Sequence, residues 1–259
     1  MVNDFFALST ASVGEATGAA DMIWLTIAIP LLSFAILLLA GKAADKWGHW
    51  LAIAASTASF VIGAAATLQL IGMDAGSRVV ESTLYTWIPA VGDFAVDFGT
   101  RVDPLSMTFV LLITFVGTLI HIYSVSYMEN DPARRRFFAY LNLFVAAMLL
   151  LVLGNSYVVL FIGWEGVGLA SYLLISFWNQ VPEYATAGKK AFVMNRVGDL
   201  GMLIAMMSMV ASFGSVKFTD VAAGVGNVSE GTATFMGIFL LLAACGKSAQ
   251  FPLQAWLGD

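Results

Sequence analysis

The sequence predicts an all-α membrane protein, a polytopic helix bundle with about seven transmembrane helices. Of the 259 residues, 59% are hydrophobic and only 11% are charged, whereas soluble domains carry about 25% charged residues. Too few polar side chains remain to cover a globule in water, which excludes a soluble enzyme. The apolar residues also gather into runs of about 20, the length that a helix needs to cross a bilayer.

Seven apolar runs define the expected spans. A polar stretch at 74–103 separates the second run from the third, and it alternates around 83–88 and 94–98. Either a short extramembrane hairpin or an irregular loop fits that stretch. A turn at 154–156 separates the fourth run from the fifth. The runs lie at about 22–41, 50–73, 104–125, 137–153, 157–177 and 191–213, and the seventh begins near 232.

The distribution of Lys and Arg predicts the orientation. Three connections, after the first, third and fifth runs, hold most of these residues, and the opposite connections hold only Arg78, Arg101 and Lys217. The positive-inside rule places the richer side in the cytoplasm and the N-terminus outside. The richer side has Lys42, Lys46, Arg134, Arg135, Arg136, Lys189 and Lys190.

The N-terminal residues and the Trp residues support this layout. The first 21 residues lack the basic start and apolar core of a signal peptide, so the first run is expected to remain as a membrane helix. Trp24, Trp47, Trp50 and Trp87 lie near the ends of runs or in the polar stretch, where they would anchor the protein at the interface.

Four charged residues fall inside predicted spans, namely Glu165, Arg196, Asp199 and Lys247. A charge near the bilayer centre costs about 2.5–3.5 kcal/mol on insertion scales, so each needs a reason to be there. Such residues commonly mark ion pathways, which makes these four the candidate site.

Glu165 and Lys247 are the residues expected to handle protons. Glycines surround Glu165, which leaves room for water and a close helix neighbour. Lys247 ends an apolar run, and a lysine can lose its proton whereas an arginine stays charged. Pro252 lies five residues on and predicts a break in the seventh helix. The alternatives are a static ion pair for Glu165 and a lysine that reaches the interface for Lys247.

Arg196 and Asp199 are expected to support that pair. They are spaced i and i+3 on one helix, so they share a face and can pair with each other. A purely structural role and an effect on the field at a titrating neighbour are both open. His121 is a weaker candidate, either a proton relay or a hydrogen-bonded residue near a helix end.

Other kinds of chemistry have no signature here. The sequence contains no phosphate-binding loop, zinc motif or cysteine cluster, and its one cysteine, Cys245, lies in an apolar run. The Lys and Arg residues form no basic stripe for nucleic acid. We therefore expect no catalytic residue, metal site, redox centre or bound cofactor in this chain.

Four segments resemble one family, the antiporter-like proton-pumping membrane subunits of complex I, the NADH:quinone oxidoreductase. They are HIYSVSYMENDPARRRFFAYLNLF (121–144), FIGWEGVGLASYLLISFW (161–178), KKAFVMNRVGDLG (189–201) and GKSAQFPLQAWLGD (246–259). The resemblance covers 101–259, an antiporter-like proton-translocating region. Residues 1–100 agree in hydropathy only and form an N-terminal segment with two helices and an extracytoplasmic loop. Family members are longer, so an N-terminal fragment is expected.

The resemblance implies roles for individual residues. Glu165 and Lys247 match the Glu–Lys pair of a half-channel, Arg196 and Asp199 match flanking charges, and Pro252 matches the break in a discontinuous seventh helix. It also implies a translocase subunit in the bacterial inner (plasma) membrane, beside other membrane subunits of a complex that uses NADH and quinone. The alternatives are a subunit of a multisubunit cation/proton antiporter and a non-transporting membrane scaffold.

Overall fold

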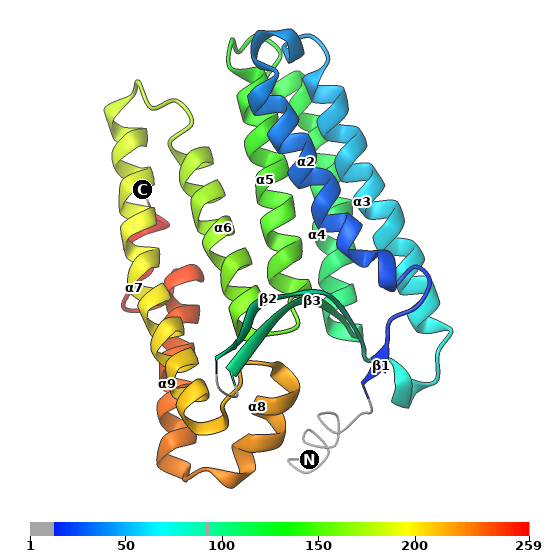
Figure 1. Cartoon of the computed structure of the whole chain (residues 1–259). Coiled ribbons are helices and arrows are strands. Elements are labelled where there is room, and N and C mark those ends of the chain that lie inside the picture. The colour runs from blue at the N-terminus through cyan, green and yellow to red at the C-terminus, as the bar shows by residue number, and fades with distance from the viewer. Residues whose placement is uncertain (1–12, 92–93, 259) are drawn as a thin grey trace.

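The computed structural model describes residues 13–91 and 94–258, and long helices dominate it (Figure 1). The prediction of an all-α bundle is confirmed. The helices are α2 (Leu25–Leu39), α3 (Gly48–Ile71), α4 (Pro104–Tyr127), α5 (Arg134–Leu153), α6 (Tyr157–Ile175), α7 (Pro182–Phe213), α8 (Phe218–Gly224) and α9 (Glu230–Lys247). Short 3-10 turns at η2 (Asp21–Trp24), η3 (Gly41–Ala44), η4 (Ala75–Ser77), η5 (Val225–Asn227) and η6 (Gln254–Trp256) complete the helical elements.

Six helices in the described ranges are long and apolar enough to cross a membrane: η2 with α2, then α3, α4, α5, α6 and α7. Each coincides with one of the first six predicted spans. The seventh, α9, has 18 residues and ends at Lys247. α7 begins at Pro182, nine residues before the expected start, because a polar first stretch extends the helix beyond its apolar run. The short helix α8 was not predicted, since it has no apolar run.

The helices form two groups that meet along α5 and α6. α2, α3, α4 and α5 pack together on one side of Figure 1, and α6, α7 and α9 lie on the other. Glycines on α6 let the two groups approach closely. A Cβ added to Gly166 would lie 2.9 Å from the Ala147 Cβ on α5. The face of α6 that holds Gly166 is therefore packed closely against α5.

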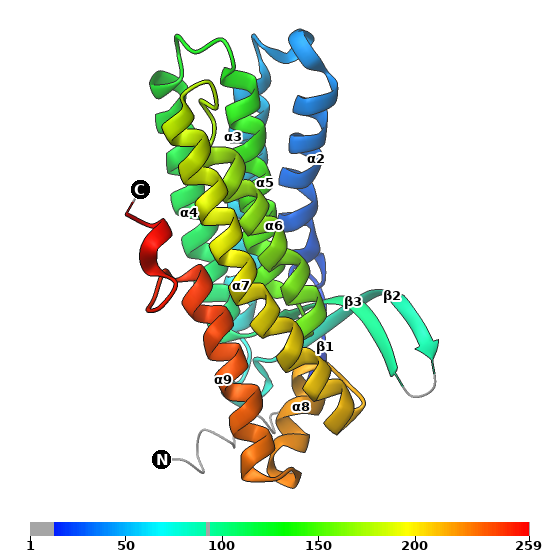
Figure 2. The ribbon, with the colours of Figure 1, turned by 90° about the vertical axis from the view of Figure 1, so that its left-hand side faces the viewer.

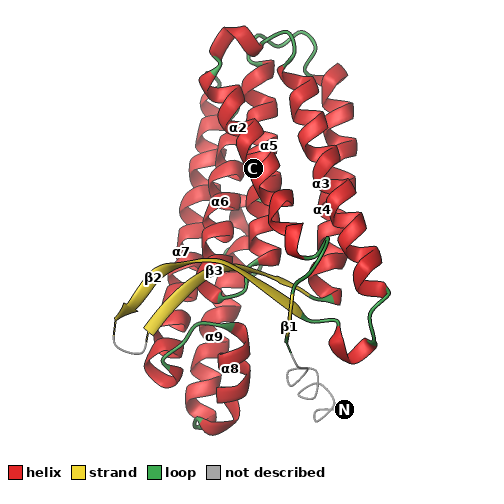
Figure 3. Cartoon of the chain, turned by 45° about the vertical axis from the view of Figure 1, so that its right-hand side comes forward, coloured by secondary structure: helices red, strands yellow, loops and turns green. Residues whose placement is uncertain are grey.

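The polar stretch between α3 and α4 is a hairpin, as one of the two predictions had it. β2 (Val80–Val91) and β3 (Phe94–Val102) pair antiparallel, and β1 (Gly14–Glu15) adds a short parallel pairing to β2. The hairpin crosses one end of the helices and extends beyond them (Figures 2 and 3).

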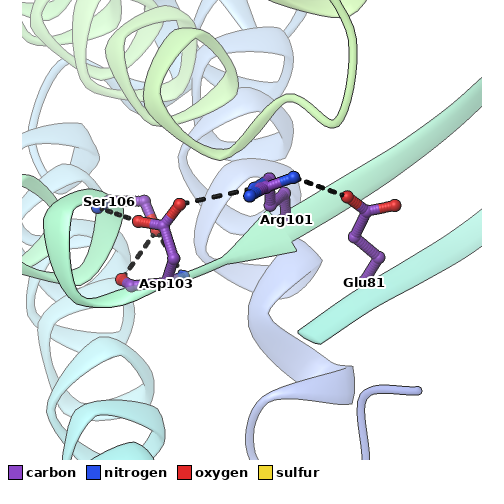
Figure 4. Close-up of polar contacts among 4 residues, drawn as sticks. All are labelled: Glu81, Arg101, Asp103 and Ser106. Atoms are coloured by element: carbon purple, nitrogen blue, oxygen red, sulfur yellow. Dashed lines mark hydrogen bonds and ion pairs between the residues drawn. The ribbon is translucent and has the colours of Figure 1, made fainter. Parts of the chain in front are cut away.

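Ion pairs fix the hairpin to the helices. Arg101 on β3 contacts Glu81 at 3.1 Å and Asp103 at 3.4 Å. Asp103 caps α4, because its carboxylate accepts the Ser106 N–H at 2.8 Å and the Ser106 hydroxyl accepts the Asp103 N–H at 2.9 Å (Figure 4). The strand therefore feeds directly into the start of a helix.

A second ion pair joins the hairpin to the segment before α8. The Lys217 ammonium donates to the Asp97 carboxylate at 2.6 Å. Hydrogen bonds from Lys217 and Thr86 hold the pKa of Asp97 below its ordinary value. The bond to Asp97 raises the pKa of Lys217 against the opposing effect of burial.

The seven basic residues predicted to share one side lie at the end of the bundle opposite the hairpin. We call this the basic end; it comprises Lys42, Lys46, Arg134, Arg135, Arg136, Lys189 and Lys190. Arg135 bridges its parts, because its Nε donates to Asp45 at 2.9 Å and its Nη1 to the Leu37 carbonyl at the end of α2. The segregation of charge is thus confirmed, and the orientation in a membrane stays a prediction.

Candidate functional site

Glycines bring α7 and α9 into backbone contact. A Cβ added to Gly198 would lie 3.1 Å from the Ala243 carbonyl oxygen and 3.1 Å from the Gly246 Cα. A Cβ on Gly201 would lie 2.7 Å from the Phe239 carbonyl oxygen. Small residues at such spacing allow close packing in a membrane. This seam brings the end of α9 beside the charged part of α7.

Three of the four predicted charges form one network. Arg196 on α7 pairs with Glu165 on α6, and its Nη1 also lies 3.4 Å from the Asp199 carboxylate. The expected i,i+3 pairing of Arg196 with Asp199 is therefore confirmed. Asp199 is buried, and it accepts a hydrogen bond from Trp164 Nε1 at 2.7 Å. Arg196 additionally lies over the Phe192 ring, 4.5 Å from its centroid.

Lys247 lies beside this network without joining it by a hydrogen bond. Its Nζ is buried and has no hydrogen-bond partner among the described residues. It lies 5.5 Å from the centroid of the Trp164 ring, and a Cβ on Gly168 would be only 2.7 Å from it. Asp199 and Arg196 are the charged groups that act on it electrostatically.

The structure therefore gives Glu165 a different partner from the one the resemblance implied. Within the described ranges no ion pair or hydrogen bond joins Glu165 to Lys247, and Arg196 occupies the carboxylate instead. One carboxylate oxygen of Glu165, Oε1, is buried without a hydrogen-bond partner in that part of the chain. Glu165 Oε1 and Lys247 Nζ, the atoms of the two predicted proton-handling residues, are thus both buried without a hydrogen-bond partner among the described residues.

The predicted break in the seventh helix is present. α9 ends at Lys247, and Ser248 begins a turn in which Ala249 has a φ of 48°. In a helix, a proline ring clashes with the carbonyl of the residue four positions earlier, which for Pro252 is Ser248. The Gly246 carbonyl, freed from the helix, accepts a hydrogen bond from Trp256 Nε1 at 3.1 Å. Lys247 is thus the last helical residue, with the open carbonyl end of α9 beside it.

His121 lies apart from the charges. It is on α4, only 1% exposed, and its Nδ1 is 2.7 Å from the Gly117 carbonyl oxygen. Its ring packs against Phe138 on α5, with centroids 6.2 Å apart. The structure does not bring it into the network of Glu165 and Arg196.

Sequence reasoning missed Trp164. It was not singled out because an aromatic residue in an apolar span normally packs or faces lipid. Its position next to Glu165 was the available signal. Within the described ranges, no group of three His, Cys, Asp or Glu side chains converges to hold a metal ion.

Two family models match the chain. The model described as NADH:quinone oxidoreductase/Mrp antiporter, TM, matches residues 154–259, which include the whole charge network. The model described as NADH-Ubiquinone oxidoreductase (complex I), chain 5 N-terminus, matches residues 87–138.

Curated relatives carry matching names. The chain is 56% identical over 236 residues to NADH-quinone oxidoreductase subunit L of Mycobacterium tuberculosis, covering 91% of the chain and 37% of that protein. It is 38% identical over 251 residues to subunit L of Escherichia coli K12, covering 92% of the chain and 39% of that protein. It is 41% identical over 234 residues to NADH-ubiquinone oxidoreductase chain 5 of Rhizopus stolonifer, covering 90% and 35%.

These alignments also bear on the first 100 residues and on length. Because 91% of the chain aligns with the mycobacterial protein, the sequence similarity extends well into residues 1–100. From the sequence alone, these residues had agreed with the family in hydropathy only. The chain spans less than two fifths of the length of these relatives.

Solved structures share the fold. The Mrp complex from Dietzia sp. DQ12-45-1b matches with a TM-score of 0.76 at 25% identity, over 91% of this chain and 25% of that one. The membrane-bound sulfane sulfur reductase, an archaeal respiratory membrane complex, matches in fold with a TM-score of 0.75 at 16% identity, over 91% and 46%. The family models, the subunit L relatives and the shared fold agree, and the chain belongs to the family of antiporter-like membrane subunits of NADH:quinone oxidoreductase.

Proposed function

We propose that this chain is part of a subunit that moves protons across the bacterial inner membrane within an NADH:quinone oxidoreductase, with its N-terminus outside. One observation carries the proposal. The Lys247 ammonium is buried without a hydrogen-bond partner among the described residues, beside the charges of Arg196 and Asp199 on α7. An intramembrane ionisable group in that setting is a candidate for ion transport.

Lys247 is the group that binds and releases the proton. Lysine can serve because it loses its proton when its surroundings change, whereas an arginine side chain keeps its charge. A carboxylate such as that of Asp199 stabilises a nearby ammonium, and a guanidinium such as that of Arg196 destabilises it. Even at an effective dielectric constant of about 20, two unit charges about 4 Å apart interact by about 4 kcal/mol.

Glu165 acts through Arg196. While Glu165 is ionised, Arg196 is shared between the carboxylates of Glu165 and Asp199, so part of the Asp199 charge remains to stabilise the ammonium of Lys247. If Glu165 takes up a proton, Arg196 is no longer shared and pairs with Asp199 alone. Asp199 then stabilises the ammonium of Lys247 less, which favours proton release. Quinone chemistry elsewhere in the complex drives this exchange in the proposal, and the chain itself binds neither NADH nor quinone.

The test measures the ratio of protons moved to electrons transferred by the intact complex in inverted membrane vesicles. Lys247→Arg keeps the positive charge and removes the exchangeable proton, so we expect a lower ratio with NADH oxidation retained. Glu165→Gln should also lower it. Lys42→Gln, a charge change at an exposed position of the basic end, is the control. Unchanged ratios in Lys247→Arg and Glu165→Gln would refute the proposal.

A cation/proton antiporter subunit is the second candidate, and the fold shared with the Mrp complex favours it. Proton movement that depends on sodium and occurs without any electron donor would distinguish this function from the first proposal. A non-transporting scaffold is a third reading, in which these charges are permanently paired and dry. Deuterium exchange into α6 and α9 of the intact complex separates it from transport, because a dry pair would exclude water from both helices.

A further inference from the structure

We propose that a pocket at the basic end binds the phosphate group of an anionic phospholipid. The pocket has a volume of about 280 Å³ and lies where α5, α6 and α7 meet. Two cationic side chains and several hydrogen-bond donors line it. They are Arg136, Tyr140, Tyr172, Ser176, Asn179 and Lys189.

The position of the pocket along the helices matches the depth of lipid headgroups. Arg136 is in the first turn of α5, Ser176 directly follows the last residue of α6, and Lys189 is in the third turn of α7. The apolar parts of all three helices lie on the same side of this level. Lipid phosphates lie just outside the hydrocarbon core, and basic pockets between helix ends attract anionic headgroups.

The charges of the pocket have no ion-pair partner in the part of the chain that the structure describes. Within the described ranges, neither Arg136 nor Lys189 has a carboxylate within 4 Å. Two uncompensated cations at one pocket favour an anion as the ligand. They also oppose a cation there, so the pocket is unsuited to admit sodium.

Arg136 is already oriented by its surroundings. Its Nη2 donates to the Phe177 carbonyl at 3.2 Å, and its guanidinium lies 4.9 Å from the centroid of the Phe177 ring. Its Nε is buried and has no acceptor among the described residues. A planar guanidinium held in this way loses little entropy when it binds a phosphate through two parallel hydrogen bonds.

The aromatic wall suits a lipid rather than a free anion. Tyr140 packs edge-on against Phe177 with centroids 6.3 Å apart, and Tyr172 packs against Phe192 at 5.4 Å. Tyrosine rings with polar ends are typical of the membrane interface. Further along the same helices, Leu169 on α6 and Val193 on α7 are exposed and offer an apolar surface to acyl chains.

The experiment is native mass spectrometry of the protein purified in detergent with whatever subunits accompany it. Phosphatidylglycerol is added, and the lipid retained is compared with phosphatidylcholine. The pocket variant is Arg136→Gln with Lys189→Gln. Its control is Lys42→Gln with Lys46→Gln, which removes the same charge from two exposed positions at the same end. We expect the pocket variant to bind phosphatidylglycerol about tenfold or more weakly, and the control to bind as the wild type.

Lys189→Gln alone keeps the test valid if the double variant does not fold, because Lys189 is exposed. It should weaken phosphatidylglycerol binding several-fold. Equal binding by pocket and control variants overturns the proposal. So does displacement of the lipid by excess inorganic phosphate, which identifies a free anion as the ligand, and so does a co-purifying protein that crosslinks to the pocket.

Discussion

Adding one methyl group at Gly168 tests whether Lys247 occupies the position described. The new Cβ would lie 2.7 Å from the Lys247 Nζ, whereas ordinary contacts between heavy atoms are about 3.5–4.0 Å. The ammonium must therefore move by about 1 Å. Because the contact is with the far end of a flexible side chain, the fold tolerates the change, and replacing a helical glycine by alanine stabilises the helix by about 1 kcal/mol.

The functional effect follows from Coulomb's law. At an effective dielectric constant of about 20, a change of about 1 Å in a separation of about 5 Å changes the interaction of two unit charges by about 0.6 kcal/mol. That corresponds to about a threefold change in the proton-binding equilibrium of Lys247. Gly168→Ala should therefore change the rate of proton movement several-fold while the melting temperature stays equal or rises.

Gly237→Ala is the matched control, because a Cβ at this position of α9 meets no heavy atom within 4 Å. It gains the same helix propensity without touching Lys247. The measurement is the initial rate of proton uptake into inverted vesicles at equal NADH oxidation, with melting temperatures of the purified proteins. If both variants move protons as the wild type does, the placement of Lys247 against α6 is wrong.

Three further predictions concern the contacts around the site and the hairpin. Trp164→Phe keeps an aromatic side chain, although a smaller one, and removes the donor to the buried Asp199 carboxylate, so it should cost about 1.5–3 kcal/mol of stability, seen as a lower melting temperature. Gly201→Ala should cost about 1–3 kcal/mol in the same assay, because its Cβ meets backbone that cannot rotate away. The hydrogen bond from Lys217 holds the pKa of Asp97 below its ordinary 3.8. This ion pair therefore stabilises the fold fully above pH 3.8, and the stabilisation is lost as the pH falls through the lowered pKa of Asp97. The wild type should lose about 0.5–1 kcal/mol of stability from this ion pair, after solvent screening, between about pH 6 and 3. Asp97→Asn should not show this loss in melting curves recorded over the same pH range.

The sequence was sufficient to predict the long apolar helices because each predicted span is a local apolar run. It left the hairpin undecided, because β2 and β3 are defined by pairing between residues that are distant in sequence, such as Glu81 and Arg101. The start of α7 at Pro182 was missed because the polar first stretch resembles a loop when only hydropathy is considered.

The candidate site was predictable in its members but not in all its contacts. The i,i+3 spacing of Arg196 and Asp199 gave their pairing directly. Spacing says nothing about contacts between helices, and there the long Arg196 side chain reaches Glu165. The role of Trp164 depends in the same way on α6 and α7 lying side by side, which only the folded chain shows.

The backbone contact between α7 and α9 has a mechanical consequence. Where these helices touch through Gly198, Gly201 and Gly246, no long side chain separates their backbones, so we expect them to shift as one body. Across from them, α6 meets the charged part of α7 through the side chains of Glu165 and Arg196, which can change partners by rotating. Any motion that couples this subunit to its neighbours should therefore occur between α6 and α7, and α9 should travel with α7.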